Sequence, residues 1–200
     1  ECEKIVYCIV YYEGKQKEIN YKLNILSEIV NKYDGIIDKI ENKFNYKSTF
    51  YIPYLRDFLT KFYIINDTFE TSVPWSNIRE VCKDIELSLL EKTKHYNLKH
   101  FLSYRITGTY ENGVCLFFML GIYHKNIENI TEVFKDIETH LRESIVNAGG
   151  SISHHNGIGK NSSKLLIENK NYIETKCINQ FKKTVDPKNI FGINNNIFNN

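Results

Sequence analysis

Two adjacent histidines lie in a glycine-rich segment three-quarters of the way along the chain. Residues 149–160 read GGSISHHNGIGK, so His154 and His155 have glycines on both sides. Glycine tolerates positive φ and lets the backbone approach a bound molecule closely. Imidazoles titrate near neutral pH, so a clustered pair can move protons or hold a polarised group. The segment therefore indicates a site for proton transfer or ligand binding, although a surface turn that contains two histidines has the same pattern.

The composition is that of a globular protein. The chain has 200 residues, of which 42% are hydrophobic and 14% aromatic, enough for one substantial core and too apolar for a disordered chain. The formal net charge is only +2 and the lysines are scattered, so we expect no nucleic-acid partner. No apolar run approaches the roughly 20 residues that span a bilayer.

The cysteines and the remaining histidines predict no metal site. The spacing of the cysteines suits neither a metal nor a disulfide framework, so we expect a reducing intracellular compartment. Cys8 and Cys115 lie in apolar strand patterns and are expected to be buried. The histidines outside the pair show no metal-ligand spacing with one another; they are His95, His100, His124 and His140.

Further segments, in order along the chain, carry a family resemblance. They are residues 54–57 (YLRD), 69–75 (FETSVPW), 104–110 (YRITGTY) followed by 113–115 (GVC), and 185–192 (VDPKNIFG). With the histidine segment they resemble the alkyldihydroxyacetonephosphate synthase (alkylglycerone-phosphate synthase) family, FAD-linked flavoenzymes of ether-lipid synthesis related to the vanillyl-alcohol-oxidase type. The resemblance is clear over residues 51–198 and weaker before them. The histidine segment alone is less specific, because related FAD-linked oxidases carry a similar loop.

The resemblance implies a reaction, a cofactor and partners. Family members exchange the acyl group of acyl-dihydroxyacetonephosphate for the alkyl group of a long-chain fatty alcohol, with FAD acting covalently rather than as a net redox carrier. The first step removes a proton beside the carbonyl, which needs a base. The expected partners are these substrates, the protein's own N-terminal FAD domain, a second copy in a homodimer and a peripheral membrane contact. The expected compartment is the peroxisome.

The resemblance also implies roles for individual residues. Arg56 matches the substrate-contacting arginine, and a guanidinium binds a phosphate or carboxylate through two parallel hydrogen bonds. The residues alone favour a helix-surface arginine that pairs with Asp57 or Glu70, and it is the match of the surrounding segment that favours the substrate contact. His154 and His155 match the first two members of the family's triple-histidine motif.

Two positions depart from the family pattern. The third histidine is replaced by Asn156, which forms hydrogen bonds but cannot titrate. The catalytic tyrosine is replaced by Phe117, which keeps the ring and loses the phenol that can act as an acid or base. Tyr110 and Tyr123 lie at strand ends, and a register slip that moved Tyr123 into place would disturb the match at Cys115.

Apolar periodicity predicts the elements. Helices are expected over residues 19–33, 53–62, 75–89 and 130–145, with further helices up to 185. Strands are expected at 4–12, 63–69, 101–110 and 114–123, with a loop at 39–48. Asn112-Gly113 lies between two apolar strands and predicts a hairpin.

This order predicts an α+β fold. We expect an antiparallel or mixed sheet covered by helices, a ferredoxin-like arrangement that the resemblance identifies with the cap or substrate domain, followed by a helical C-terminal segment. The predicted boundaries are 1–148 for the cap domain, 149–192 for the histidine loop and the helical segment that returns to the FAD domain, and 193–200 for a flexible Asn-rich tail.

The chain opens with ECEK and carries no Rossmann-type glycine fingerprint or flavin-binding block. We therefore expect a fragment that lacks the FAD domain and is inactive by itself. No peroxisomal tripeptide ends the chain, which closes with Phe198-Asn199-Asn200.

Three functional hypotheses stay open. The first is the C-terminal part of a working synthase. The second, favoured by Phe117 and Asn156, is a catalytically degenerate relative that acts as a binding or scaffolding subunit. The third is another FAD-linked oxidase, against which the tandem histidines and residues 69–75 argue.

Overall fold

The computed structural model describes residues 6–37, 51–169, 172–193, 195 and 198. The chain forms two compact units, Glu1–Phe50 and Tyr51–Asn200. The sequence did not predict this division at residue 50, and the predicted boundary between 148 and 149 falls inside the second unit.

The described part of the first unit contains one helix, α1, over Gln16–Lys32. It confirms the helix expected at 19–33, and Glu18 and Lys32 suit the two ends of the helix dipole. The strand expected at 4–12 is wrong for its described residues, because residues 6–12 form no strand. A strand needs a neighbour for its backbone hydrogen bonds, and the described residues of this unit provide none. Cys8 is consequently exposed rather than buried, and the loop expected at 39–48 lies outside the described residues.

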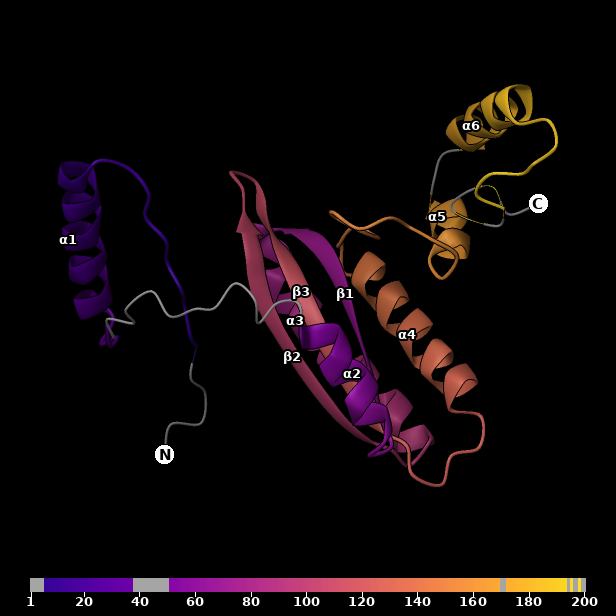
Figure 1. The fold of residues 1–200 in the computed structure, drawn as a ribbon, viewed down its shortest axis with the longest axis horizontal. Helices are drawn as coiled ribbons and strands as arrows, with labels where there is room; N and C mark the ends of the chain where they lie inside the picture. Colours follow the sequence, from indigo (N-terminus) through magenta and orange to yellow (C-terminus); the bar gives the residue numbers. More distant parts are fainter. Residues whose placement is uncertain (1–5, 38–50, 170–171, 194, 196–197, 199–200) are drawn as a thin grey trace. The chain divides into compact units, whose positions relative to one another are not determined.

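The second unit is built on an antiparallel sheet of three strands (Figure 1). The strands are β1 over Ile64–Pro74, β2 over Lys99–Thr109 and β3 over Gly113–Tyr123, in the order β1-β3-β2. The predicted hairpin joins β2 to β3, and the Tyr110 N–H donates to the Gly113 carbonyl at 2.8 Å across it. The α+β prediction is confirmed, and the sheet is antiparallel.

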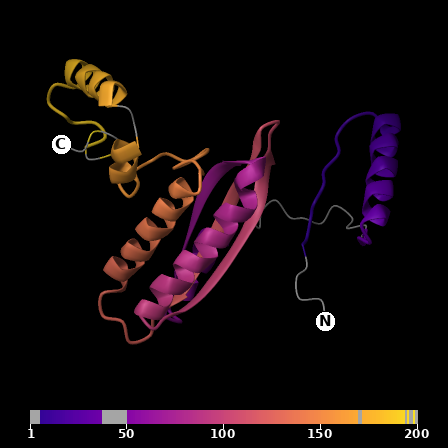
Figure 2. The ribbon, with the colours of Figure 1, turned by 180° about the vertical axis from the view of Figure 1, so that it is seen from behind.

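Two long helices cover one face of this sheet, as Figure 2 shows from behind. They are α3 over Ile78–His95, entered through the short 3-10 turn η2 at Trp75–Asn77, and α4 over Ile130–Asn147. Alternate residues of β3 point into this layer, and all of them are almost fully buried: Val114, Leu116, Phe118, Leu120 and Ile122. The helices contribute Ile85 and Leu89 from α3 and Ile137 and Leu141 from α4, each 0% exposed. The apolar residues, which recur every second residue in the strand and about every 3.6 residues in the helices, thus pack into one core.

The opposite face of the sheet is largely open. Of the helices between residues 51 and 147, only the short α2, over Ile52–Thr60, lies on this side, where it packs against β1. Pro53 lies in its first turn, where its missing N–H costs no hydrogen bond. The β3 residues that face this side are Cys115, Phe117, Met119, Gly121 and Tyr123, which alternate with the core residues.

The chain continues through the histidine segment into two further helices. These are α5 over Ser163–Asn169 and α6 over Tyr172–Val185, as the sequence predicted. Among the described residues, no helix is both long and apolar enough to cross a membrane.

The turn after α6 is organised by Asp186, a buried carboxylate. Its Oδ1 accepts the Ile190 N–H at 3.0 Å and its Oδ2 the Phe191 N–H at 2.9 Å, and it pairs with Lys182 one helical turn earlier. The Lys182 ammonium and these backbone donors lower the pKa of Asp186 from 3.8 to about 2.

The first prediction concerns the core. Leu89→Ala should destabilise the protein by about 2–5 kcal/mol, because it leaves a cavity between helix and sheet. Leu87→Ala on the same helix removes the same atoms from a side chain that is 53% exposed, and should cost no more than about 0.5 kcal/mol. Chemical denaturation measures both changes, and equal losses would contradict the core described here.

The second prediction concerns pH. The folded-state pKa of Asp186 is lowered, so its contribution to stability is complete above 3.8 and is lost as the pH falls toward 2. Asp186→Asn should therefore lower the melting temperature at neutral pH and have almost no effect near pH 2. Asp57→Asn, at an exposed position, is the control for the removal of a carboxylate elsewhere in the same unit. A constant difference at every pH would contradict the carboxylate's role.

Candidate active site

The end of α4 delivers the histidine segment to the edge of β1. Gly149 has φ +84°, a left-handed conformation that glycine adopts readily. Gly150 passes so close to its neighbours that an added Cβ would lie 2.8 Å from Thr71 Oγ1 and 2.6 Å from Ile145 Cγ2. The two glycines are therefore required by the turn and by the close approach of the segment to β1.

Ser151 fastens the segment to this strand. Its backbone N–H donates to the Ser72 carbonyl at 2.9 Å, and its Oγ accepts the Ser72 N–H at 2.8 Å. The Thr71 hydroxyl donates to the Ser151 carbonyl at 2.7 Å. These bonds place the following residues, 153–156, beside the open face of the sheet.

A buried carboxylate lies inside the turn that these residues form. Glu70 of β1 is 3% exposed, and its Oε1 accepts the backbone N–H groups of three successive residues. The donors are His154 at 3.1 Å, His155 at 2.7 Å and Asn156 at 2.6 Å. The Oε2 atom pairs with Nδ1 of His155.

This environment keeps Glu70 ionised. Burial raises the pKa of its carboxyl, but the three backbone N–H donors and the neighbouring His155 outweigh burial and lower the pKa below its ordinary value. The carboxylate is therefore charged at neutral pH.

The imidazoles of His154 and His155 lie next to each other beside the Glu70 carboxylate. Nδ1 of His154 lies 3.0 Å from Nδ1 of His155. The buried Cys115 thiol, on β3, lies 3.9 Å from Glu70 Oε2 and 4.0 Å from His155 Nδ1. The ring of Tyr110, at the end of β2, lies 5.4 Å from the His154 ring. The predicted histidines are thus brought together with residues from β1, from β3 and from the turn that joins β2 to β3.

Four potential metal donors in this cluster lie within 4.8 Å of one another: Glu70, Cys115, His154 and His155. The prediction of no metal site considered spacing along the sequence and did not include this spatial group. Both Glu70 oxygens already have hydrogen-bonding partners, so hydrogen bonds alone account for its arrangement.

Phe117 lies in the same cross-strand row as Glu70 of this cluster. It pairs with Glu70 on β1 and with Arg105 on β2, and the Arg105 guanidinium lies 4.9 Å from the centre of its ring. Tyr123 pairs with Ile64 at the far end of the sheet. The register therefore does not move Tyr123 to position 117, and the tyrosine ring beside His154 is that of Tyr110.

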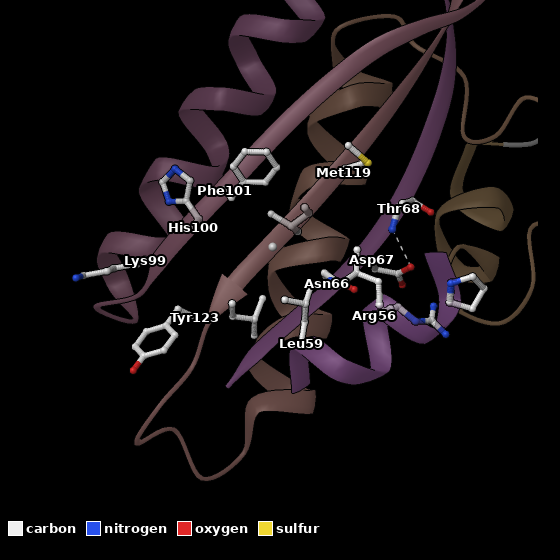
Figure 3. A pocket seen from close by; sticks show the side chains of 15 residues that line it. Arg56, Leu59, Asn66, Asp67, Thr68, Lys99, His100, Phe101, Met119 and Tyr123 are labelled. Atoms are coloured by element: carbon white, nitrogen blue, oxygen red, sulfur yellow. Dashed lines mark hydrogen bonds between the residues drawn. The ribbon is translucent and has the colours of Figure 1, made fainter. Parts of the chain in front are cut away.

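Arg56 lines a separate part of the same face. It lies on α2 beside a cavity of about 650 Å³ between this helix and the sheet (Figure 3). The cavity is mostly apolar, and its lining includes Leu59 of α2, Phe101 of β2 and Met119 of β3. In the described part of the chain, Arg56 forms no ion pair with Asp57 or with Glu70, whose oxygens are used by the histidine segment. Arg56 is thus exposed, as expected of a surface arginine, but the expected pairing with either carboxylate is not found in the described residues.

The cavity and the histidine cluster are neighbours along the strands. Thr68 and Met119, which line the cavity, pair with each other, and the next row on this face is Glu70 with Phe117. Successive rows on one face of a strand are roughly 7 Å apart. The open face thus combines a cationic side chain, an apolar cavity and an imidazole pair in one continuous surface.

Comparison with known proteins agrees with this arrangement. A family model described as FAD linked oxidases, C-terminal domain, matches residues 1–193. The chain belongs to this family. Its relatives include proteins named alkyldihydroxyacetonephosphate synthase from Caenorhabditis elegans (31% identical over 183 residues, 90% of this chain and 31% of the relative) and Dictyostelium discoideum (26% over 186 residues, 91% and 30%). The chain thus spans about a third of the length of these relatives.

Two solved structures of alkyldihydroxyacetonephosphate synthase share the fold. One matches with a TM-score of 0.62 at 22% identity, over 90% of this chain and 29% of the other. The second matches with a TM-score of 0.64 at 23% identity, over 90% and 30%. The resemblance that the sequence motifs indicated is confirmed for the family and the fold, whereas the roles of single residues stay predictions.

The sequence motifs did not reveal the central role of Glu70, which was expected only as part of the segment 69–75 and as a possible partner for Arg56. The available signal was a glutamate next to Phe69 in an apolar strand pattern, because a carboxylate in such a position needs donors from elsewhere in the fold.

The third prediction tests the attachment of the segment. Ser151→Ala removes the acceptor of the Ser72 N–H and should cost about 1–3 kcal/mol. It should also speed hydrogen exchange at the amides of residues 154–156. Thr184→Ala is the control, since that exposed hydroxyl donates to the Gln180 carbonyl within α6. Unchanged exchange in the Ser151 variant would show that the segment is held by other contacts.

Proposed function

We propose that this chain is the C-terminal, substrate-facing part of an alkyldihydroxyacetonephosphate synthase and acts together with an FAD-binding domain. The reaction is the exchange of the acyl group of acyl-dihydroxyacetonephosphate for a long-chain alkyl group. The observation that carries the proposal is the open sheet face, on which the His154–His155 pair borders an apolar cavity lined by Arg56. The names of the relatives and the family match support the same activity.

The open face also fits a flavin. Phe101 is 62% exposed and Met119 is 40% exposed, so part of this face is apolar and uncovered, and the half-exposed imidazole of His155 lies at its edge. A flat ring system with polar edges needs such a combination of apolar contact and hydrogen-bonding groups. We propose that Phe117, Met119 and the histidine pair face the flavin, which supplies an electrophilic ring when bound.

The chemistry of the side chains suits different residues of this chain to different steps. Arg56 is suited to bind the phosphate of the substrate, because a guanidinium forms two parallel hydrogen bonds with it. The apolar cavity is suited to an aliphatic chain, whose burial contributes roughly 0.8 kcal/mol per CH₂. An imidazole of the histidine pair removes the proton beside the substrate carbonyl.

A second candidate function is lipid or flavin binding without catalysis. Phe117 and Asn156 favour it, since each lacks the titrating group that the family pattern has at its position. The Tyr110 ring, 5.4 Å from the His154 ring, favours the active synthase, because it brings a phenol side chain beside the imidazole pair.

The fourth prediction separates these functions. The protein, assayed with its FAD domain, should transfer labelled fatty alcohol to acyl-dihydroxyacetonephosphate. His155→Gln should lower the rate by about 10²–10⁴-fold, the usual contribution of a general base. His95→Gln is the control, because His95 is exposed at the end of α3 on the far side of the sheet.

Two other outcomes would change the conclusion. If only the double variant Phe117→Tyr with Asn156→His forms product, the protein is a relative that has lost catalysis and kept the fold. No product from either protein, with FAD bound, would contradict the synthase and favour the binding role.

A further inference from the structure

We propose that Glu70 is a positioning residue that holds the histidine backbone with one oxygen and sets the tautomer of His155 with the other, so that Nε2 of His155 becomes the proton acceptor of the site. The link to catalysis rests on the proposed function, whereas the assignment of the hydrogen atoms rests on geometry alone.

The two carboxylate oxygens have separate tasks. Oε1 accepts three backbone N–H groups within 3.1 Å, which fixes the path of residues 154–156. Oε2 faces Nδ1 of His155. The carboxylate is 3% exposed, so water does not replace these donors.

The hydrogen on His155 follows from this contact. An ionised carboxylate only accepts hydrogen bonds, so the contact requires a hydrogen on Nδ1 of His155. A neutral imidazole carries one hydrogen, which leaves Nε2 as an acceptor. The His155 side chain is 52% exposed although its Nδ1 edge faces a buried group, so the exposed part of the ring is the part that carries Nε2.

The hydrogen on His154 follows in turn. Its Nδ1 lies 3.0 Å from the protonated Nδ1 of His155, whose single hydrogen is directed at Glu70 Oε2. A hydrogen on Nδ1 of His154 would face that N–H at close range, so the hydrogen of His154 lies on Nε2. Two neighbouring rings therefore present opposite polarity, an acceptor on His155 and a donor on His154. The single contact between Glu70 and His155 therefore fixes the tautomers of both histidines.

This pair suits removal of a proton beside a carbonyl. The C–H bond breaks as a bond forms between its proton and Nε2 of His155, and the electron pair moves toward the carbonyl oxygen. The Nε2–H of His154 can donate to that oxygen. The imidazolium that forms on His155 is stabilised by the Glu70 carboxylate, as in other carboxylate–histidine pairs.

Glu70→Gln tests the proposal without dismantling the segment. The amide oxygen can still accept the three backbone N–H groups, while the amide NH₂ now faces Nδ1 of His155 and donates to it. The hydrogen of His155 should therefore move to Nε2. ¹⁵N NMR of the flavin-loaded protein, labelled at its histidine nitrogens and assigned with His155→Gln, reports which nitrogen is protonated.

Activity and stability are measured on the same variant. For an aspartate-to-asparagine change that gives the wrong tautomer in a protease triad, the loss in kcat is about 10⁴-fold, and we expect a loss of that order here with KM nearly unchanged. The hydrogen exchange of the amides of residues 154–156 should stay slow in Glu70→Gln and become fast in Glu70→Ala, which removes the acceptor itself.

Glu138→Gln is the matched control. Among the described residues Glu138 is the other buried glutamate, 5% exposed, and it pairs with Arg142 on α4 rather than with a histidine. Its substitution should leave the His155 tautomer and the transfer rate unchanged.

The outcomes separate this inference from the proposed function. A hydrogen that stays on Nδ1 of His155 in Glu70→Gln, or one already on Nε2 in the unmodified protein, would overturn the inference whatever the activity. A tautomer that moves as expected in a protein that transfers no alkyl group would support the inference and contradict the synthase activity.

Discussion

A buried carboxylate needs hydrogen-bond donors, and Glu70 finds them in a segment more than eighty residues away along the chain. Burial of an ionised group is costly unless it is paired and hydrogen-bonded. The three backbone N–H groups and the His155 ring meet that requirement for Glu70, and Glu70 in turn gives those N–H groups the acceptor that a turn at a sheet edge otherwise lacks. Strand and histidine segment therefore depend on each other, and the geometry of the candidate site depends on both.

The remainder of the fold supplies the frame for this contact. Both long helices pack on one face of the sheet, so the hydrophobic core is complete without the other face. The alternation along β3 then assigns Leu116 and Phe118 to the core and Cys115 and Phe117 to the open side. Because the hydrophobic core does not use the opposite face of the sheet, that face can carry the cavity, Arg56 and the His154–His155 pair.

The two departures from the family pattern affect this frame differently. Asn156 still donates its backbone N–H to Glu70, so the segment keeps its shape although the third imidazole is absent. Phe117 keeps its place in the register and stacks beneath Arg105, so the ring is retained while the phenol is lost. Both positions thus keep a contact of the fold, and the Tyr110 ring lies beside His154.

The sequence alone determined the helices, the hairpin at Asn112-Gly113 and the family, because these depend on local periodicity, turn chemistry and short motifs. It also identified the histidine pair. It predicted a strand near Cys8 wrongly, since an apolar run becomes a strand only where a neighbouring strand accepts its hydrogen bonds. Only the tertiary structure showed that Glu70 joins His154 and His155. Strand pairing and burial bring these residues together, and a contact between residues so far apart along the chain leaves no periodic signal in the sequence.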